Sequence, residues 1–234
     1  VKASMLARLN TLALGKSGVH DIVIDLMTTL INKNITPIIY EHGGVGASGD
    51  LVQLAHIALT LIGDGEVMYK NKRLTTKKVF EIENLKPIPI KIREGIALMN
   101  GTSVMTGIGV INTIYSRRLL NWMIAISASI NEIVKAYDDH LSFELNQSKK
   151  HKGQREIAKR MRNHLKDSLL TRKREHHLYN QAIEVDIFED KVQEYYSLRC
   201  VPQILGPVLD TLETVEKILF KEVNSANDNP IVDL

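Results

Sequence analysis

The sequence has little of three features that would each point to a particular class of protein. Cys200 is the single cysteine of the 234 residues, so no disulfide framework can form within the chain, and a reducing compartment, the cytoplasm, is expected. The formal net charge of +3 is too small to indicate a nucleic-acid or membrane-surface partner. The most apolar stretch, residues 119–130, contains Asn121, Ser127 and Ser129 and is too short to span a bilayer. We therefore predict neither a nucleic-acid nor a membrane partner.

Residues 149–174 are strongly basic, with eleven Lys or Arg residues, but they lack the interleaved aromatic residues that stack on bases. An apolar stripe at helical spacing instead predicts an amphipathic helix with a solvated basic face: Ile157, Met161, Leu165 and Leu169. No metal site is predicted, because the histidines here have no metal-ligand spacing and no Glu or Cys completes a set: His151, His164, His176 and His177.

Apolar residues recur at helical spacing over most of the chain. Helices are predicted over residues 5–13, 21–32, 51–61 and 102–146, with a last helix after Pro207. Residues 37–49 are expected to form a loop and residues 66–75 a small β-hairpin, the only regular sheet. The predicted fold class is therefore mainly α: a bundle of long helices with a small β-hairpin and a glycine-rich active-site loop.

The pattern over residues 102–146 contains almost no helix breaker. Its apolar side chains repeat every three or four positions, which is typical of a core helix of a large bundle, here broken once or twice. The predicted stripe consists of Val104, Ile108, Ile111, Tyr115, Leu119, Trp122, Ile126, Ile130, Ile133 and Tyr137.

Ala47-Ser48-Gly49, within the glycine-rich stretch 41–56, can form an electrophile from its own backbone. The Gly49 amide nitrogen has no side chain beside it to hinder attack on the Ala47 carbonyl carbon, and the Ser48 hydroxyl can leave as water. Cyclisation with loss of two waters would give a 4-methylidene-imidazol-5-one (MIO), which no ordinary side chain can replace. The neighbouring glycines allow the positive-φ backbone that ring closure needs. Asp50 is expected near the N-cap of the helix that follows.

The same stretch also satisfies a dinucleotide-binding fingerprint, with glycines at positions 44, 46 and 49 and Glu66 about 20 residues further on. That motif has meaning only in a βαβ unit with a parallel sheet. The following pattern is helical, without a second strand–helix alternation, so no nucleotide cofactor is predicted.

The stretch from Gly46 to Leu51, followed by Leu54-Ala-His56, resembles the signature of the aromatic amino-acid ammonia-lyases, the histidine, phenylalanine and tyrosine ammonia-lyases and related aminomutases. The resemblance covers essentially the whole chain. It implies that Ala47, Ser48 and Gly49 form the MIO group autocatalytically, without a metal or a nucleotide. The group would capture the amino group of an aromatic L-amino acid, as in covalent catalysis generally.

Two further motifs match residues that the family places at the substrate. Asn100, in Met99-Asn100-Gly101-Thr102, corresponds to the asparagine that contacts the prosthetic ring and the amino-acid end of the substrate. Arg199, in the segment 193–200, matches the arginine that binds the substrate carboxylate, for which a planar, always charged fork is well suited. Tyr196 and Gln193 match the tyrosine and glutamine that hydrogen-bond around the ring.

A fourth motif, residues 224–230, corresponds to a loop that packs beside the prosthetic ring, and Asn224 and Asn229 are given a supporting role. The resemblance also implies that residues 1–95 belong to the N-terminal prosthetic-group domain and residues 96–234 to the central helical-bundle domain. Because the chain begins at Val1 and ends directly after a motif, it is expected to be an internal piece of a chain roughly twice as long.

The resemblance implies elimination of ammonia from L-tyrosine, to give the α,β-unsaturated acid, by a homotetramer. Histidine ammonia-lyase activity giving urocanate, or an MIO-dependent aminomutase, would use the same residues. A non-catalytic assembly domain on the same scaffold is a further alternative, although the intact Ser48 and Arg199 argue against it. The family's tyrosine base would precede residue 1, so the 234-residue chain alone is expected to be inactive.

Overall fold

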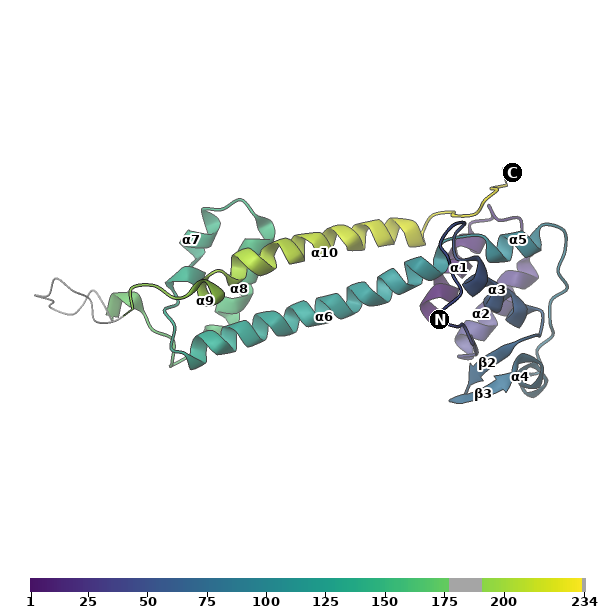
Figure 1. The fold of residues 1–234 in the computed structure, drawn as a ribbon, viewed down its shortest axis with the longest axis horizontal. Helices are drawn as coiled ribbons and strands as arrows, with labels where there is room; N and C mark the ends of the chain where they lie inside the picture. Colours follow the sequence, from purple (N-terminus) through teal and green to yellow (C-terminus); the bar gives the residue numbers. More distant parts are fainter. Residues whose placement is uncertain (177–190, 233–234) are drawn as a thin grey trace, which may run out of the picture. The chain divides into compact units, whose positions relative to one another are not determined.

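The computed structural model describes residues 1–176 and 191–232, which group into two compact units (Figure 1). The first unit comprises Val1–Asn112 and Glu216–Leu234, and the second Thr113–Val215. The long helices α6 (Ser103–Ile133) and α10 (Val201–Val223) contribute to both units. The fold is mainly α-helical, as predicted. The division predicted near residue 95 concerns the domains of the complete protein and stays a prediction.

The first unit consists of short helices and a small sheet around an apolar core. Three helices lie where the periodicity predicts them: α1 (Lys2–Ala13), α2 (Asp21–Asn32) and α3 (Leu51–Leu61). Two were not predicted, because their 8 and 6 residues are too few to show a helical period: α4 (Thr76–Glu83) and α5 (Glu94–Met99). Fully or almost fully buried side chains from these elements form the core, among them Met5, Leu12, Met27, Leu54, Val79 and Leu98.

The predicted hairpin is confirmed, but it belongs to a three-stranded antiparallel sheet of order β1-β2-β3. The strands β2 (Glu66–Tyr69) and β3 (Lys72–Thr75) are joined by Lys70 and Asn71, with φ of 47° and 61°. Positive φ at both central residues is the signature of a two-residue hairpin turn of type I′.

The third strand corrects the expectation that the loop begins at residue 37. The strand β1 (Thr36–Pro37) pairs with β2 in the register Thr36–Met68 and Pro37–Val67. A two-residue strand is too short to show alternation, and proline is tolerated at a sheet edge. All strand pairs in the described part of the chain are antiparallel, so the sheet does not provide the βαβ unit that dinucleotide binding requires.

The predicted run over residues 102–146 is a single helix only as far as Ile133. The chain then turns at Lys135, with φ of 52°, and continues as the 3-10 helix η1 (Asp139–Leu141) and the short α7 (Phe143–Gln147). The basic segment forms α8 (Lys152–Leu165), whose apolar stripe is buried as predicted except for Leu169, which lies beyond the helix end and is 97% exposed.

The last helix begins at Val201, whereas the sequence predicts that it begins after Pro207. Proline inside a helix removes a hydrogen bond and costs about 3 kcal/mol or more. The buried side chains of Val201, Leu205 and Leu209 offset this cost, because they place the first turns of α10 in the core of the unit. The same core receives Ile157 and Met161 of α8, together with Leu120, Ile124 and Ala128 of α6.

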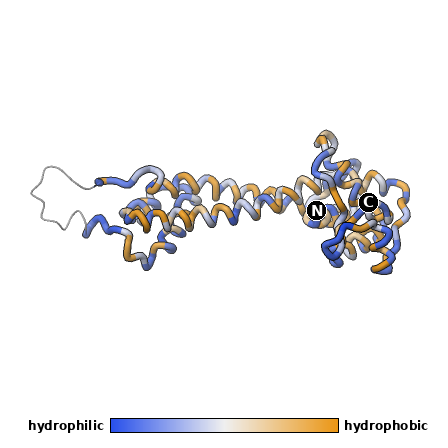
Figure 2. Tube along the Cα trace, turned by 60° about the horizontal axis from the view of Figure 1, so that its bottom comes forward, coloured by the Kyte–Doolittle hydropathy of each residue, from blue (hydrophilic) through white to orange (hydrophobic). Residues whose placement is uncertain are grey.

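The stripe predicted for the core on α6 is largely exposed in this chain. Ile108, Leu119 and Trp122 are 55%, 62% and 67% exposed, whereas Leu120 and Ile124 are buried. Figure 2 shows hydrophobic residues, in orange, recurring along the long helices. A helix that is apolar on more than one face is typical of the interior of a larger structure. Within residues 1–176 and 191–232, no helix combines the length and the hydropathy needed to cross a membrane.

Candidate active site

The glycine-rich loop, residues 38–50, joins β1 to α3 and carries the three residues of the predicted electrophile. Ala47 and Ser48 are exposed, and Gly49 is half-buried. Gly46 and Gly49 have φ of 65° and 86°, a conformation that side-chain-bearing residues rarely adopt. The loop therefore has the positive-φ glycines that the sequence predicts for ring closure.

Gly49 lies directly against the backbone of Gly101, in the second predicted motif. A Cβ atom at Gly49 would lie 2.5 Å from the Gly101 carbonyl oxygen, which is closer than real Cβ atoms come. The N–H of Asp50 donates a hydrogen bond of 2.8 Å to the same oxygen. Gly49 and Gly101, which are 52 positions apart in sequence, are thus joined by backbone contacts, and only glycine fits at position 49.

Asp50 is the N-cap residue of α3, as predicted, but its side chain makes no hydrogen bond to the start of that helix. Its Oδ2 accepts hydrogen bonds of 2.8 Å from the backbone N–H groups of Val104 and Met105, in the first turn of α6. A carboxylate there satisfies donors that no helical carbonyl can reach and also favours the positive end of the helix dipole. Asp50 therefore ties the loop to the start of α6.

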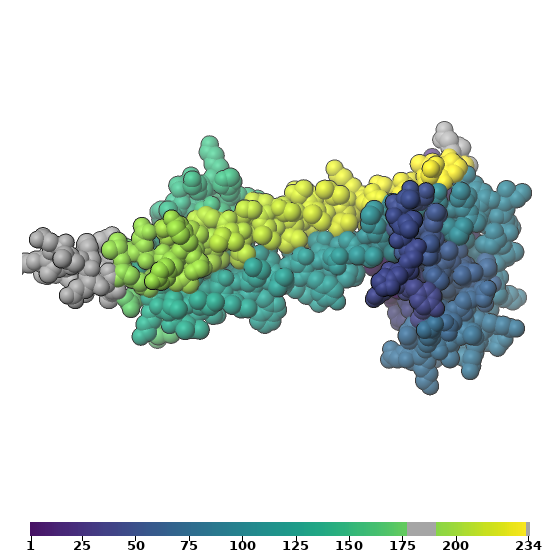
Figure 3. Space-filling view, in the orientation of Figure 1, coloured from purple at the N-terminus to yellow at the C-terminus, as the bar shows by residue number. Residues whose placement is uncertain are grey.

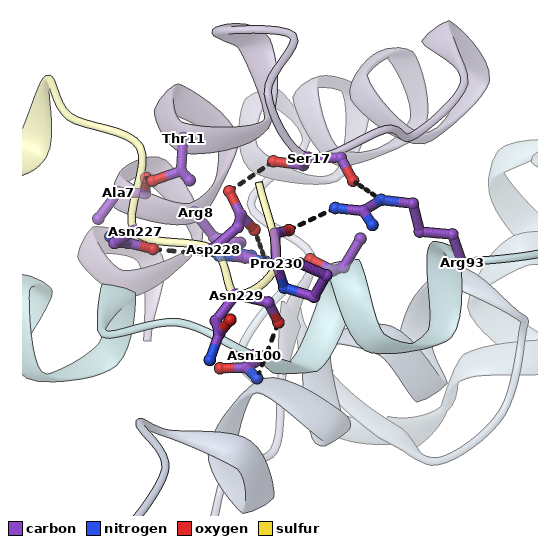
Figure 4. Close-up of polar contacts among 11 residues, drawn as sticks. Ala7, Arg8, Thr11, Ser17, Arg93, Asn100, Asn227, Asp228, Asn229 and Pro230 are labelled. Atoms are coloured by element: carbon purple, nitrogen blue, oxygen red, sulfur yellow. Dashed lines mark hydrogen bonds and ion pairs between the residues drawn. The ribbon is translucent and has the colours of Figure 1, made fainter. Parts of the chain in front are cut away.

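Asn100 ends α5, and its Nδ2 donates a 3.2 Å hydrogen bond to the backbone carbonyl of Asn229 (Figure 4). The structure thus joins two of the predicted residues in the first unit. Asn224 does not reach this contact, because its Nδ2 donates to the Phe220 carbonyl at the end of α10. The supporting role predicted for Asn224 and Asn229 stays a prediction.

Arg8 of α1 lies at the centre of a polar cluster that sequence reasoning missed (Figure 4). Its side chain is fully buried and forms a 2.7 Å ion pair with Asp228, whose other oxygen accepts a 2.7 Å bond from the Ser17 hydroxyl. Burial lowers the pKa of the Arg8 guanidinium, while the Asp228 carboxylate acts in the opposite direction. Arg8 lies between Met5 and Leu12 on one helical stripe. A charged residue on an otherwise apolar helix face is therefore the sequence signal that could have identified it.

The cluster joins the two ends of the described chain. Figure 3 shows the C-terminal residues, in yellow, against the purple and blue N-terminal ones. Arg93, just before α5, adds to this contact because its Nε donates 3.0 Å to the Ser17 carbonyl and its Nη2 donates to the Pro230 carbonyl. The 227–230 segment is thereby fixed on both sides.

The remaining predicted residues lie in the second unit. Tyr196 begins the short helix α9 (Tyr196–Arg199) and is 70% exposed, with the Arg199 guanidinium 4.3 Å from its ring centroid. Gln193 and Arg199 line a cavity of about 340 Å³ together with Glu194 and His140. The Arg199 Nε is buried without a hydrogen-bond partner among the described residues. A guanidinium with a free donor in a polar cavity suits recognition of a carboxylate.

Glu194 and His140 were not singled out from the sequence. The Glu194 carboxylate accepts from the Tyr137 N–H at 2.9 Å and from Lys191 at 2.8 Å, so it fixes the turn that follows α6. Burial lowers the pKa of His140, although nearby Asp139 and Glu194 act in the opposite direction. No three His, Cys, Asp or Glu residues within 1–176 and 191–232 gather as a metal site, and His177 lies outside the described residues.

The chain matches one family model and is similar to several known proteins. The family model for the aromatic amino acid lyases matches residues 1–234. The chain is 39% identical over 240 residues to a tyrosine 2,3-aminomutase of Myxococcus fulvus, covering 99% of the chain and 45% of that protein. It is 37% identical over 231 residues to a histidine ammonia-lyase of Bacillus cytotoxicus, covering 99% and 43%.

A solved structure of the Pantoea agglomerans phenylalanine aminomutase matches with a TM-score of 0.91 and 33% identity, covering 100% of this chain and 46% of that one. The chain thus spans less than half the length of the relatives it matches.

Asp50→Ala is expected to loosen the start of α6, because two backbone donors lose their acceptor. Loss of a capping side chain costs about 1 kcal/mol, so amides at the start of α6 should exchange hydrogen about fivefold faster. Hydrogen exchange followed by mass spectrometry measures this directly. The exposed Asp25 in the middle of α2 provides the control variant Asp25→Ala. Equal exchange at α6 in both variants would show that Asp50 is not its cap.

Proposed function

The chain belongs to the aromatic amino acid lyase family, and from that premise we propose that the complete protein eliminates ammonia from an aromatic L-amino acid. The product would be the corresponding α,β-unsaturated acid. The observation that carries the proposal is the contact of Gly49 with the backbone of Gly101, with positive φ at Gly49. Because Asn100 directly precedes Gly101, this contact supports a site in which the asparagine lies near the expected electrophile.

We propose that Ala47, Ser48 and Gly49 form the MIO group in a self-contained dehydration. A bond forms between the Gly49 nitrogen and the Ala47 carbonyl carbon, and the Ala47 oxygen leaves as water with the two amide hydrogens of Ser48 and Gly49. The Ser48 Oγ then leaves as a second water with the hydrogen of its Cα, so no oxidant or metal is needed. Once formed, the group supplies an electrophilic methylene to the substrate amino group.

The other residues would bind and orient. Asn100 is an amide that both donates and accepts without titrating, and its bond to the Asn229 carbonyl fixes its side chain. Arg199 would bind the substrate carboxylate through its fork. Tyr196 stacks against Arg199 and leaves its ring exposed, where its hydroxyl could hydrogen-bond near the substrate, and Gln193 lines the same cavity as Arg199.

L-Tyrosine is the substrate we favour. Two alternatives are supported by the similar proteins, which include a histidine ammonia-lyase and a tyrosine 2,3-aminomutase. An aminomutase would retain the ammonia and add it back, giving a β-amino acid. The residues that distinguish these reactions are expected outside this chain, together with the base, so the 234 residues alone would not turn over substrate.

The complete protein is proposed to act as a homotetramer in the cytoplasm. The exposed apolar side chains of α6, among them Leu119, Trp122 and Ile126, support burial of this helix against another protein surface. The cytoplasmic location rests on the single cysteine. A non-catalytic assembly domain would keep the apolar helix without needing the loop chemistry, and the mass of the loop peptide distinguishes the two functions.

Ser48→Ala is expected to abolish formation of the electrophilic methylene and the reaction, because it removes the leaving hydroxyl. Mass spectrometry of the complete protein should show that the peptide containing residues 47–49 has lost two waters in the wild type and at most one in Ser48→Ala, because ring closure alone releases only the first water. Ser129→Ala, an exposed position on α6, is the matched control and should behave as the wild type. An unmodified wild-type peptide would refute MIO formation and favour the assembly domain.

The same proteins are then offered L-tyrosine, L-histidine and L-phenylalanine separately, with ultraviolet detection of the unsaturated acids and chromatography for β-amino acids. Coumarate from tyrosine supports the proposal. Dominant urocanate formation would make the protein a histidine ammonia-lyase, and a dominant β-amino acid an aminomutase. Absence of any product from a dehydrated wild type would refute all three.

Arg199→Lys is expected to weaken substrate binding although the charge is kept, because the bidentate fork and the planar contact with Tyr196 are lost. We expect KM to rise about tenfold, equivalent to ~1.4 kcal/mol. Steady-state kinetics of the complete protein measures this. Arg160→Lys, on the surface of α8, is the control. An unchanged KM in Arg199→Lys would exclude the carboxylate role.

A further inference from the structure

We propose that Arg8, through its buried pair with Asp228, is a positioning residue for ring closure in the Ala47-Ser48-Gly49 loop. Its hydrogen bonds go to Ala97, Asn227 and Asp228, and it would act through the backbone of Gly101. This role rests on the proposed function, because it concerns formation of the same prosthetic group.

Arg8 is held in place by two different segments of the chain. Its Nη2 donates to Asp228 Oδ1 at 2.7 Å (Figure 4). The same nitrogen donates to the carbonyl of Ala97, near the end of α5. Its Nη1 donates to Asn227 Oδ1 at 3.3 Å. A fully buried cation is tolerated only where it is paired and hydrogen-bonded. The guanidinium and its acceptors therefore fix one another's positions.

The Arg8 guanidinium packs against Gly101. A Cβ atom at Gly101 would overlap Arg8 Nη1 and would lie 2.6 Å from Asn227 Oδ1. The carbonyl of Gly101 is in contact with Gly49 and accepts the hydrogen bond of Asp50. The Gly101 backbone is thus enclosed between Arg8 and the loop, and no side chain separates them.

Ring closure depends on where this backbone lies. The Gly49 nitrogen must approach the Ala47 carbonyl carbon closely, and misplacement of reacting atoms by about 1 Å can cost a factor of about 100 in rate. Because Gly49 packs against Gly101, a shift of Gly101 toward Arg8 would remove the backbone contact that holds Gly49 in place. Ala97 lies three residues before Asn100, so the same guanidinium also fixes the helix end that carries Asn100.

The test compares Arg8→Lys with Ser17→Ala in the complete protein. Lysine keeps the charge and can still pair with Asp228, but its single nitrogen cannot form the planar wall against Gly101. Ser17→Ala removes a different hydrogen bond to Asp228 and leaves every Arg8 contact in place. We expect the dehydrated fraction of the 47–49 peptide to fall at least tenfold in Arg8→Lys and to remain at the wild-type level in Ser17→Ala, with circular dichroism confirming folded protein.

A double variant, Arg8→Met with Asp228→Asn, removes both charges. It tests the positioning role if Arg8→Lys fails to fold. Folded protein with an unmodified peptide, in either variant, supports the positioning role. Full dehydration in a folded variant overturns it, and so does loss of folding in both variants, because Arg8 would then act on stability alone. An unmodified peptide in the wild type would instead refute the proposed function.

Discussion

The backbone of Gly101 is the contact on which the first unit's part of the candidate active site depends. Its carbonyl lies against Gly49 and accepts the N–H of Asp50, and the position of its missing side chain is bounded by Arg8 and Asn227. A side chain at position 49 or 101 would collide with one of these neighbours. The absence of side chains here is therefore a packing requirement as well as a source of backbone freedom.

This contact links the loop that carries the predicted electrophile to distant parts of the fold. Asp50 lies at the end of the loop, and its carboxylate caps the first turn of α6. Arg8, which lies against Gly101, pairs with Asp228, which is 220 positions away in sequence. A loop whose Ala47 and Ser48 are exposed is thereby supported from α1, α5, α6 and the C-terminal segment. Such support is what a strained cyclisation would need.

Local sequence patterns predict much of this fold, but they fail where contacts between residues distant in sequence determine the structure. The spacing of apolar residues locates α1, α2 and α3, and the hairpin follows from its turn. The sequence correctly suggests that Asp50 is the N-cap residue of α3, but it does not show that tertiary folding brings the Asp50 carboxylate to the start of α6. Periodicity cannot select the buried face of α6, because that helix is apolar on more than one side. Arg8 and Asp228 carry no local signal of their pairing.

The central claim, that packing at Gly101 prepares the loop for dehydration, is tested most directly by Gly101→Ala in the complete protein. Gly95→Ala is the control, because a Cβ there meets nothing within 4 Å. Mass spectrometry of the 47–49 peptide is the measurement. The account predicts a folded Gly101→Ala protein with an unmodified peptide and a fully dehydrated Gly95→Ala protein. Complete dehydration in Gly101→Ala would contradict it.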